Sequence, residues 1–234
     1  MDISREAFIK TITMMGAGFL LGNPDISLGK EVLVPDHFLW GCSNLKEGIE
    51  LLKKMTGVEA VIGGKHPDIG THNALISLGN KVYLEIIAPD PEANSLSDEY
   101  IFLKDFKAPK LFYWAAHTED IEGLLKRISA LKLTNSGINA GSRKKPDGTV
   151  LEWKSLSIES ENFLPFFIQW GKQSRHPSLE APKGCTIESY WLESPTPNEL
   201  KKEFTQLNIK MPLKYGKQDL LHLRLNTPKG IVTL

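Results

Sequence analysis

The order of apolar and polar positions repeats three times along the chain. In each copy, apolar residues recur every three or four positions in one segment, which is typical of a helix that buries one face. Later segments of the first two copies alternate apolar and polar residues, as half-buried strands do. The repeat predicts an α+β fold built from βαβββ units. The three helices are expected after the capping residues Asn44, Thr118 and Thr196, and the first is expected to end at Gly57.

Turn signals divide the strand segments. Gly79-Asn80 is a short hairpin signal in the first copy, and residues 145–148 form a Lys-Pro-Asp-Gly turn in the second. The strands are expected at residues 38–42, 59–62, 71–78 and 81–88 in the first copy, at 111–116, 136–140, 150–158 and 163–170 in the second, and at 190–192, 220–225 and 231–234 in the third.

Strand alternation places a histidine and a glutamate on the same side of the first unit. Phe38 and Trp40 lie on the apolar face of their strand and His37 lies on the other. On the later strand, Leu84 lies on the apolar face and Glu85 on the other. If the apolar faces pack under the helix, His37 and Glu85 face the opposite side together. Imidazole and carboxylate are ligands of divalent metals. The alternative is that His37 only hydrogen-bonds at the start of its strand, whereas Glu85 is costly to bury unpaired and therefore favours a cavity role.

Composition excludes several classes of protein. With 41% hydrophobic and 24% charged residues among 234, the chain is globular. Lys plus Arg and Asp plus Glu each total 28, so the net charge of zero gives no bias toward nucleic acid or acidic membranes. The basic runs at 53–54, 143–145 and 201–202 are expected to be solvated helix faces and a turn. Two cysteines, Cys42 and Cys185, form no disulfide framework. The glycines of residues 137–142 lack the strand-to-helix context of a nucleotide-binding loop, so no nucleotide cofactor is expected.

Residues 1–30 are set apart from the fold. The apolar run at 11–22 is too short to span a bilayer as a helix, so no stable membrane span is expected. Residues 4–10 resemble the bacterial twin-arginine export motif, with Glu6 in place of the second arginine. This pattern predicts export to the periplasm or cell envelope. The alternative is an uncleaved N-terminal helix on a cytoplasmic protein.

Short motifs in both large units resemble the bacterial glyoxalase-like group of the vicinal oxygen chelate superfamily. That superfamily includes glyoxalase I, extradiol dioxygenases and bleomycin-resistance proteins. The motifs that carry the resemblance cover about residues 34–180 and are Asp36-His37, Gly63-Gly64-Lys65-His66-Pro67, Gly70-Thr71-His72-Asn73, Tyr83-Leu84-Glu85, Leu151-Glu152-Trp153, Leu164-Pro165-Phe166-Phe167-Ile168-Gln169-Trp170 and His176-Pro177.

The resemblance implies that repeated βαβββ units form a curved mixed sheet around a cup, with the helices on the outer face. Residues 31–180 are then the paired domain, and 181–234 a third, shortened unit through which a homodimer could form. Metal ligands are expected on the first and last strands of each unit. The first unit supplies His37 and Glu85, but the second has Leu111, Phe166 and Phe167 at the corresponding positions.

The implied function is that of a divalent-metal-dependent enzyme, lyase or dioxygenase-like, acting on a small oxygen-rich molecule. The alternative, favoured by the missing second pair of ligands, is a metal-free protein that sequesters a small molecule. In the enzyme, His37 and Glu85 hold the metal, and Glu85 or His66 moves a proton. Candidate substrate-binding residues are Thr71, Asn73, Trp153, Gln169, Trp170 and His176.

Each of these residues also has a structural alternative. Thr71 and Asn73 could cap the hydrogen-bond ladder of their strand, and the two tryptophans could pack in the core. His66 and His176 stand beside prolines and could serve only as turn or loop residues.

Overall fold

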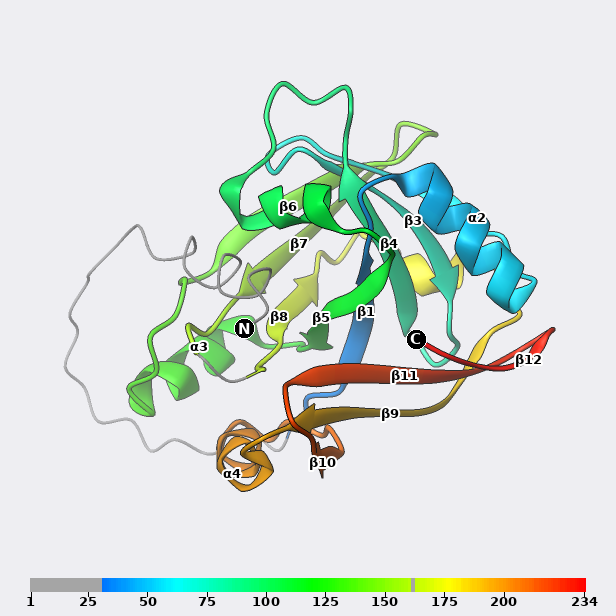
Figure 1. The fold of residues 1–234 in the computed structure, drawn as a ribbon. Helices are drawn as coiled ribbons and strands as arrows, with labels where there is room; N and C mark the ends of the chain where they lie inside the picture. Colours follow the sequence, from blue (N-terminus) through cyan, green and yellow to red (C-terminus); the bar gives the residue numbers. More distant parts are fainter. Residues whose placement is uncertain (1–30, 161–162) are drawn as a thin grey trace.

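The computed structural model describes residues 31–160 and 163–234, and two βαβββ units form its main body (Figure 1). The predicted export signal lies outside the described residues. The first unit consists of β1 (Pro35–Gly41), α2 (Leu45–Thr56), β2 (Val61–His66), β3 (Thr71–Ser77) and β4 (Tyr83–Pro89). The second consists of β5 (Lys110–His117), α3 (Ile121–Ala130), β6 (Asn139–Lys144), β7 (Val150–Leu156) and β8 (Phe166–Trp170). Two short 3-10 helices, η2 (Asp98–Asp105) and η3 (Pro177–Leu179), lie in the connections.

The eight strands of these two units close into a barrel in the order β1-β4-β3-β2-β6-β7-β8-β5. This confirms the expected curved mixed sheet and shows that the curvature continues to full closure. One joint is the antiparallel pairing of β1 with β5, in which Phe38 lies opposite Trp114. The other is narrow, with Lys65 of β2 opposite Lys144 of β6.

Strand alternation separates the inside of the barrel from the outside as predicted. In the parallel pairing of β1 with β4, His37 lies beside Tyr83 and Leu39 beside Glu85, and these four side chains face the interior. Phe38 and its neighbours of the same parity face outward into the apolar core. That core lies between the barrel and the elements packed around it. The barrel therefore has an apolar exterior face, whereas its interior is lined by many polar residues.

The three helices begin and end at residues that the sequence largely indicates. Asn44 caps α2 by accepting a hydrogen bond from the Glu47 backbone, and Gly57 ends the helix with a φ of 82°. The expected cap of the second helix is wrong by two residues. Asp120, not Thr118, accepts the hydrogen bond from a first-turn backbone N–H of α3. The Thr118 hydroxyl instead donates to the carboxylate of Glu31 and accepts a hydrogen bond from the Asp120 backbone N–H.

The strand β2 extends further than its sequence suggests. It was expected to end at Ile62, before a glycine-rich turn, but it continues through Gly63 and Gly64 to His66. The pairing of β2 with β3 shifts register between Ile62 and Gly64, which is the irregularity that a small residue permits. His66 is therefore the last residue of a strand and not a turn residue.

The third unit has the same element order but a different pairing pattern. It consists of β9 (Thr186–Ser194), α4 (Pro197–Leu207), β10 (Leu213–Tyr215), β11 (Leu220–Thr227) and β12 (Gly230–Thr233). Its sheet has the order β10-β9-β11-β12, so its first strand lies between the second and third, whereas β1 pairs with the last strand of its own unit. The unit forms a separate sheet and adds no strand to the barrel.

This four-stranded sheet and α4 cover the outside of the joint between β1 and β5, and β9 and β11 run side by side below the barrel (Figure 1). Phe38 of β1 contacts Tyr190, with ring centroids 5.7 Å apart, and Trp114 of β5 contacts Phe204 of α4 at 6.4 Å. The third unit thus buries aromatic side chains that the barrel would otherwise expose. Self-association through this unit stays a prediction.

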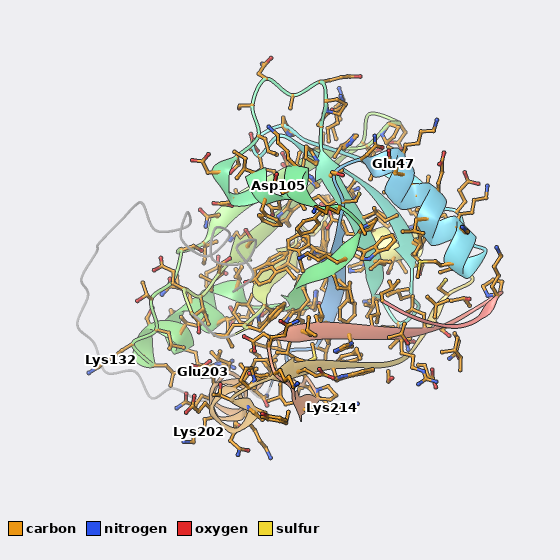
Figure 2. All side chains as sticks on the ribbon, viewed as in Figure 1. Glu47, Asp105, Lys132, Lys202, Glu203 and Lys214 are labelled. Carbon is orange, nitrogen blue, oxygen red and sulfur yellow. The ribbon has the colours of Figure 1, made fainter. Side chains whose placement is uncertain are left out.

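Charged side chains cover the outer surface, where Lys132, Lys202 and Lys214 lie at the periphery (Figure 2). Within residues 31–160 and 163–234, no helix is long and apolar enough to cross a membrane.

Candidate functional site

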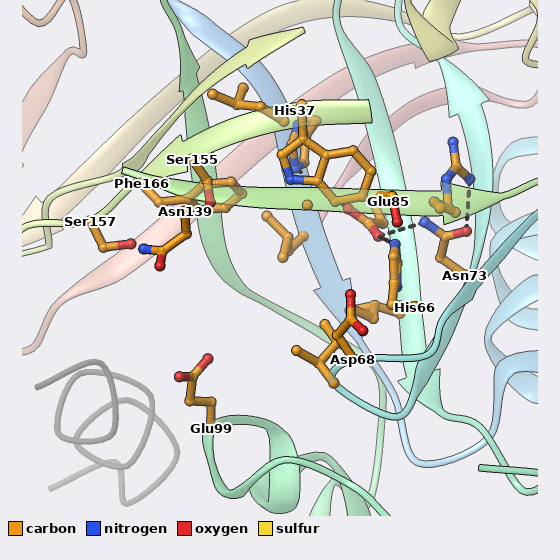
Figure 3. A pocket seen from close by; sticks show the side chains of 18 of the residues that line it. His37, His66, Asp68, Asn73, Glu85, Glu99, Asn139, Ser155, Ser157 and Phe166 are labelled. Atoms are coloured by element: carbon orange, nitrogen blue, oxygen red, sulfur yellow. Dashed lines mark hydrogen bonds and ion pairs between the residues drawn. The ribbon is translucent and has the colours of Figure 1, made fainter. Parts of the chain in front are cut away.

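The barrel encloses a cavity of about 450 Å³ whose walls come from both units. In Figure 3, His37, Glu85, His66 and Asn73 gather at one end, while Ser155, Ser157 and Asn139 lie at the other. Asp68 and Glu99 lie at the mouth, on the connections outside the barrel strands. The walls also include Leu39, Ile69, Tyr83, Ile87, Tyr100, Ser136, Ala140, Gly141, Ser142, Arg143, Trp153, Phe166, Ile168 and Trp170.

The two residues that the sequence singled out meet at one end of this cavity. Nε2 of His37 lies 3.5 Å from Oε2 of Glu85, and the two side chains are 3% and 7% exposed. Tyr83 stacks on the His37 ring, with centroids 4.5 Å apart and planes 18° apart. Burial raises the pKa of the Tyr83 hydroxyl well above its usual value, so this ring is a neutral wall.

A carboxylate behind His37 fixes the orientation of its ring. Pro35 of β1 pairs with Ala116 and His37 with Ala115, so Asp36 is an extra residue in the pairing and forms a β-bulge. The bulge brings Oδ1 of Asp36 within 2.7 Å of Nδ1 of His37. Since a carboxylate only accepts hydrogen bonds, Nδ1 carries the proton and Nε2 is the atom presented to Glu85.

Asp36 binds three further side chains and is 1% exposed. Its Oδ2 accepts hydrogen bonds from Nε1 of Trp170 at 3.0 Å and from Nε2 of His176 at 3.1 Å, and it lies 3.3 Å from Nδ1 of His117. Burial alone would raise the pKa of Asp36, but the hydrogen bonds from His117, His176 and His37 together hold it well below its usual value. Asp36 is therefore an anion at neutral pH.

Charge compensation for Asp36 comes from His117. Hydrogen bonding to Asp36, then to Glu119, raises the pKa of His117 to about 9, against the opposing effect of burial. His117 is thus protonated at neutral pH. His176 is held differently: the Ser178 backbone N–H donates to its Nδ1, so Nε2 carries the proton that His176 donates to Asp36.

His66 approaches Glu85 from a neighbouring strand. Its Nδ1 lies 3.0 Å from the Thr71 hydroxyl, and its Nε2 lies 3.9 Å from Oε1 of Glu85. Burial lowers the pKa of His66 to about 4, although Glu85 acts in the opposite direction. His66 is therefore neutral at pH 7, and a neutral ring can carry one proton toward the carboxylate.

Glu85 is held by an amide that is itself held by a buried cation. Nδ2 of Asn73 donates to Oε1 of Glu85 at 2.6 Å, and Nη1 of Arg143 donates to Oδ1 of Asn73 at 2.9 Å. The two bonds fix which end of the amide faces the carboxylate. Arg143 is 3% exposed, so its predicted place in a solvated basic run is wrong. Side chains on β6 alternate, and Arg143 takes the inward position while its lysine neighbour is exposed.

The remaining sequence candidates fall into three positions. Trp153 and Trp170 are cavity walls. Thr71 and His176 lie behind the wall and hold His66 and Asp36 in place. Gln169 lies outside the cavity, where its Oε1 accepts a hydrogen bond from the Ile121 backbone at the start of α3. Alternation explains this, because Phe166, Ile168 and Trp170 of the same strand face inward.

The second unit presents aromatic and hydroxyl groups where the first presents His37 and Glu85. Phe166 lines the cavity and lies edge-on to His37, with centroids 5.5 Å apart, whereas Phe167 is fully buried in the outer core. The acid–base groups therefore come almost entirely from one half of the barrel. The other half forms a wall of mixed apolar and hydroxyl character.

The donors present do not make a three-ligand metal site. In the described part of the chain, no group of three or more His, Cys, Asp or Glu side chains is arranged to hold a metal ion. His37 and Glu85 are close enough to be two ligands, but His66 lies 3.9 Å from the far oxygen of Glu85. A catalytic site usually has three protein ligands. The buried guanidinium of Arg143, which donates to Asn73, also carries a positive charge that would repel a metal ion at this end of the cavity.

Three residues of this site do not stand out in the sequence. Asp36 belongs to a motif, but alternation places it on the opposite face and the pattern does not reveal the bulge. His117 directly precedes the expected helix cap Thr118, which is a sufficient explanation for a polar residue there. Arg143 lies beyond the strand expected at residues 136–140, but β6 continues to Lys144 and places Arg143 at the cavity wall.

Comparison with known proteins places this barrel in a family. The model of the glyoxalase-like domain family matches residues 36–208, which is most of the chain. No curated protein matches the sequence. A crystal structure of a hypothetical protein from Staphylococcus aureus has a TM-score of 0.65 at 16% identity, and the similarity covers 87% of this chain and 98% of that one. It shows a shared fold.

Methylmalonyl-CoA epimerases overlap more loosely. The Mycobacterium tuberculosis enzyme has a TM-score of 0.39 at 18% identity, covering 57% of this chain and 85% of that one. A Streptomyces coelicolor variant in complex with 2-nitronate-propionyl-CoA has a TM-score of 0.44 at 15% identity, covering 62% and 99%. These overlaps are too loose to bear on the activity of this chain. Its family match and paired βαβββ barrel make it a member of the glyoxalase-like domain family, within the vicinal oxygen chelate superfamily.

Proposed function

We propose that this protein is an enzyme that moves a proton on a small, oxygen-bearing substrate held in the barrel cavity. His37 and Glu85 are the acid–base pair. The observation that carries the proposal is the separation of 3.5 Å between His37 Nε2 and Glu85 Oε2 at a wall of a cavity large enough for a small molecule.

The chemistry of the cavity favours proton transfer over covalent catalysis. Among the described lining residues there is no Cys or Lys, and none of the lining serines hydrogen-bonds a histidine. A nucleophile of the usual kind needs such an activating base within hydrogen-bond reach. Two titratable groups facing each other, each held by a buried partner, are instead what general acid–base catalysis requires.

Each member of the pair is restrained on the side away from the substrate. Asp36 holds Nδ1 of His37, which leaves Nε2 to give or take a proton. Asn73 holds Oε1 of Glu85, which leaves Oε2 toward His37. In the proposed reaction, one group removes a proton from the carbon beside a carbonyl or carboxyl group, and the other delivers a proton to the product. Such a step serves an isomerase or a lyase.

The test is solvent deuterium exchange. Small 2-oxo acids, 2-hydroxy acids and their methyl esters that raise the melting temperature of the protein are incubated with it in D₂O. Proton NMR then follows loss of the signal from the carbon beside the carbonyl. We expect exchange faster than in buffer, reduced by about 10²- to 10⁴-fold in Glu85→Gln and His37→Gln. Glu92→Gln is the matched control, because Glu92 is exposed and pairs with Lys65 outside the cavity.

Compounds that bind without enzyme-dependent exchange would contradict the proposal. They would favour the metal-free sequestering protein instead. Exchange that persists unchanged in both cavity variants would show that the reaction does not use this pair.

A divalent-metal-dependent enzyme is the second candidate, favoured by one distance. Two ligands of a tetrahedral ion with bonds of about 2.1 Å lie about 3.4 Å apart, close to the 3.5 Å between His37 Nε2 and Glu85 Oε2. The Asp36 carboxylate on Nδ1 is also the partner that metal-bound histidines commonly have. Mass spectrometry of metal content in wild type, His37→Ala and Glu85→Ala decides: stoichiometric metal lost in both variants supports this candidate, and substoichiometric metal unchanged by them removes it.

A further inference from the structure

Arg143 is a buried cation in the wall of the cavity whose hydrogen-bonding capacity is mostly unused. It is 3% exposed and lies in the inward row of β6. In the described part of the chain its guanidinium donates one side-chain hydrogen bond, to Oδ1 of Asn73, and pairs with no carboxylate. A guanidinium has five N–H donors in a planar fork. The rest of that fork borders the cavity.

The backbone around Arg143 is built to admit the guanidinium. A Cβ added to Gly63 would lie 2.0 Å from Nη1 of Arg143 and 2.3 Å from Oδ1 of Asn73. A Cβ added to Gly64 would lie 2.3 Å from the Lys144 carbonyl oxygen and 3.1 Å from Cγ of Arg143. Gly63 therefore leaves the space that the guanidinium occupies, whereas Gly64 allows β2 to approach the backbone of β6 at Lys144.

Burial of a positive charge without a paired anion is costly. Glu85 is the anion nearest along the hydrogen-bond chain, but the neutral amide of Asn73 stands between them. His66 and Tyr83 both feel the positive field of Arg143, which acts to lower the pKa of each. An anionic group of a ligand would supply the missing partner, in the two-point geometry that arginine offers to carboxylates.

We propose that Arg143 is the anion-binding residue of the cavity and that the substrate carries a carboxylate. This inference rests on the proposed function and names its substrate class. Asn73 contacts both Arg143 and Glu85, so a carboxylate bound at Arg143 places the adjacent carbon close to Glu85. That carbon is the one whose proton the His37–Glu85 pair exchanges. The rest of the substrate extends past Trp153 toward the hydroxyl groups of Ser155 and Ser157.

The test compares charged and neutral probes of the same shape. Malonate and succinate, each against its diamide, are titrated at constant ionic strength, with binding read from the melting temperature and by calorimetry. We expect the dicarboxylates to bind and the diamides not to. In Arg143→Gln and Arg143→Met the dicarboxylate affinity should fall about 10- to 100-fold, with partial retention in Arg143→Lys, which keeps the charge and loses the fork.

Lys144→Gln is the matched control, since Lys144 is exposed and next in sequence on the same strand. Circular dichroism checks that each variant is folded, and Arg143→Lys keeps the test valid if the neutral variants are not. Equal stabilisation of wild type by diamides, no stabilisation by either dicarboxylate, or dicarboxylate binding that survives in Arg143→Gln would each overturn the inference.

The same samples separate this inference from the proposed function. Arg143-dependent binding of dicarboxylates without deuterium exchange at their methylene groups would refute proton transfer and leave the anion site standing. Glu85-dependent exchange in neutral esters that is unchanged in Arg143→Gln would refute the anion site and leave proton transfer standing.

Discussion

The carboxylate of Asp36 and the imidazole of His37, adjacent in sequence, hydrogen-bond to each other at 2.7 Å because a β-bulge lets both side chains reach the same region of the barrel wall. On a regular strand, neighbouring side chains point to opposite faces. Because of the bulge, Asp36 can hydrogen-bond to the residue that follows it and set the tautomer of His37. It also lets Asp36 bind His117 and His176, which come from two other segments of the chain.

The substitution Asp36→Asn should lower the pKa of His117. The variant keeps the shape of the side chain but removes the charge that stabilises the His117 imidazolium, so the pKa of His117 should fall from about 9 toward its usual value near 6.5. Loss of one member of a buried charge cluster should lower the free energy of unfolding by about 3 kcal/mol. Histidine NMR titration measures the first effect and urea denaturation the second.

Asp147→Asn is the control for this variant, because Asp147 is an exposed turn residue paired with Lys145. It should leave the His117 titration unchanged and alter stability by less than about 0.5 kcal/mol. A His117 pKa that remains near 9 in Asp36→Asn would mean that Glu119, its other partner, holds the proton.

Strand alternation was sufficient to predict one half of the site. A period of two residues predicted the shared face of His37 and Glu85 on strands 48 positions apart, because both strands turn their apolar face outward into the same core. The same rule, applied to β8, would have placed Gln169 outside the cavity. It could not place Arg143, because the expected strand ended at residue 140 whereas β6 continues to Lys144.

Other features could not be read from the pattern. The bulge at Asp36 depends on how β1 pairs with β5, which is a contact between distant segments. The closure of the barrel depends on a single residue pair, Lys65 with Lys144, which no local pattern indicates. In the third unit the helix and three of the four strands were predicted, but β10 was not. No local pattern indicates that β9 lies between β10 and β11.

Gly63→Ala should destabilise the barrel through Arg143. The added methyl group meets Nη1 of Arg143 and Oδ1 of Asn73, so the guanidinium must move out of a packed wall, at a cost of about 1–3 kcal/mol. Combining it with Arg143→Ala should recover part of that loss, because the clash partner is gone. The coupling between the two changes is expected to exceed about 1 kcal/mol in a double-mutant cycle measured by urea denaturation. Additive effects would contradict the packing described here.

Phe204→Ala should show that the third unit and the barrel unfold together. Phe204 is 3% exposed and contacts Trp114 of the barrel, so truncation should cost about 3–5 kcal/mol. Thermal unfolding should remain a single transition at a lower temperature, whether followed by tryptophan fluorescence or by circular dichroism. Tyr215→Ala is the matched control: Tyr215 is 75% exposed on the same unit and should change stability little. Two separate transitions in Phe204→Ala would indicate that the units are only loosely coupled.

The pH dependence of stability should have two limbs, each assigned to one histidine. Burial lowers the pKa of His66 to about 4, so between pH 6.5 and 4 the unfolded chain binds a proton that the folded one does not, and stability falls as the pH drops. A pKa difference of about 2.5 units between the folded and unfolded states corresponds to about 3 kcal/mol of unfolding free energy. The variant His66→Gln should therefore flatten this acid limb. The pKa of His117 is raised to about 9, so its contribution is complete below pH 6.5 and is lost as the pH rises through 9. His117→Gln should flatten that alkaline limb alone. Urea denaturation of both variants from pH 4 to 9.5 measures the two limbs, and an acid limb of unchanged slope in His66→Gln would show that His66 is not the group that titrates there.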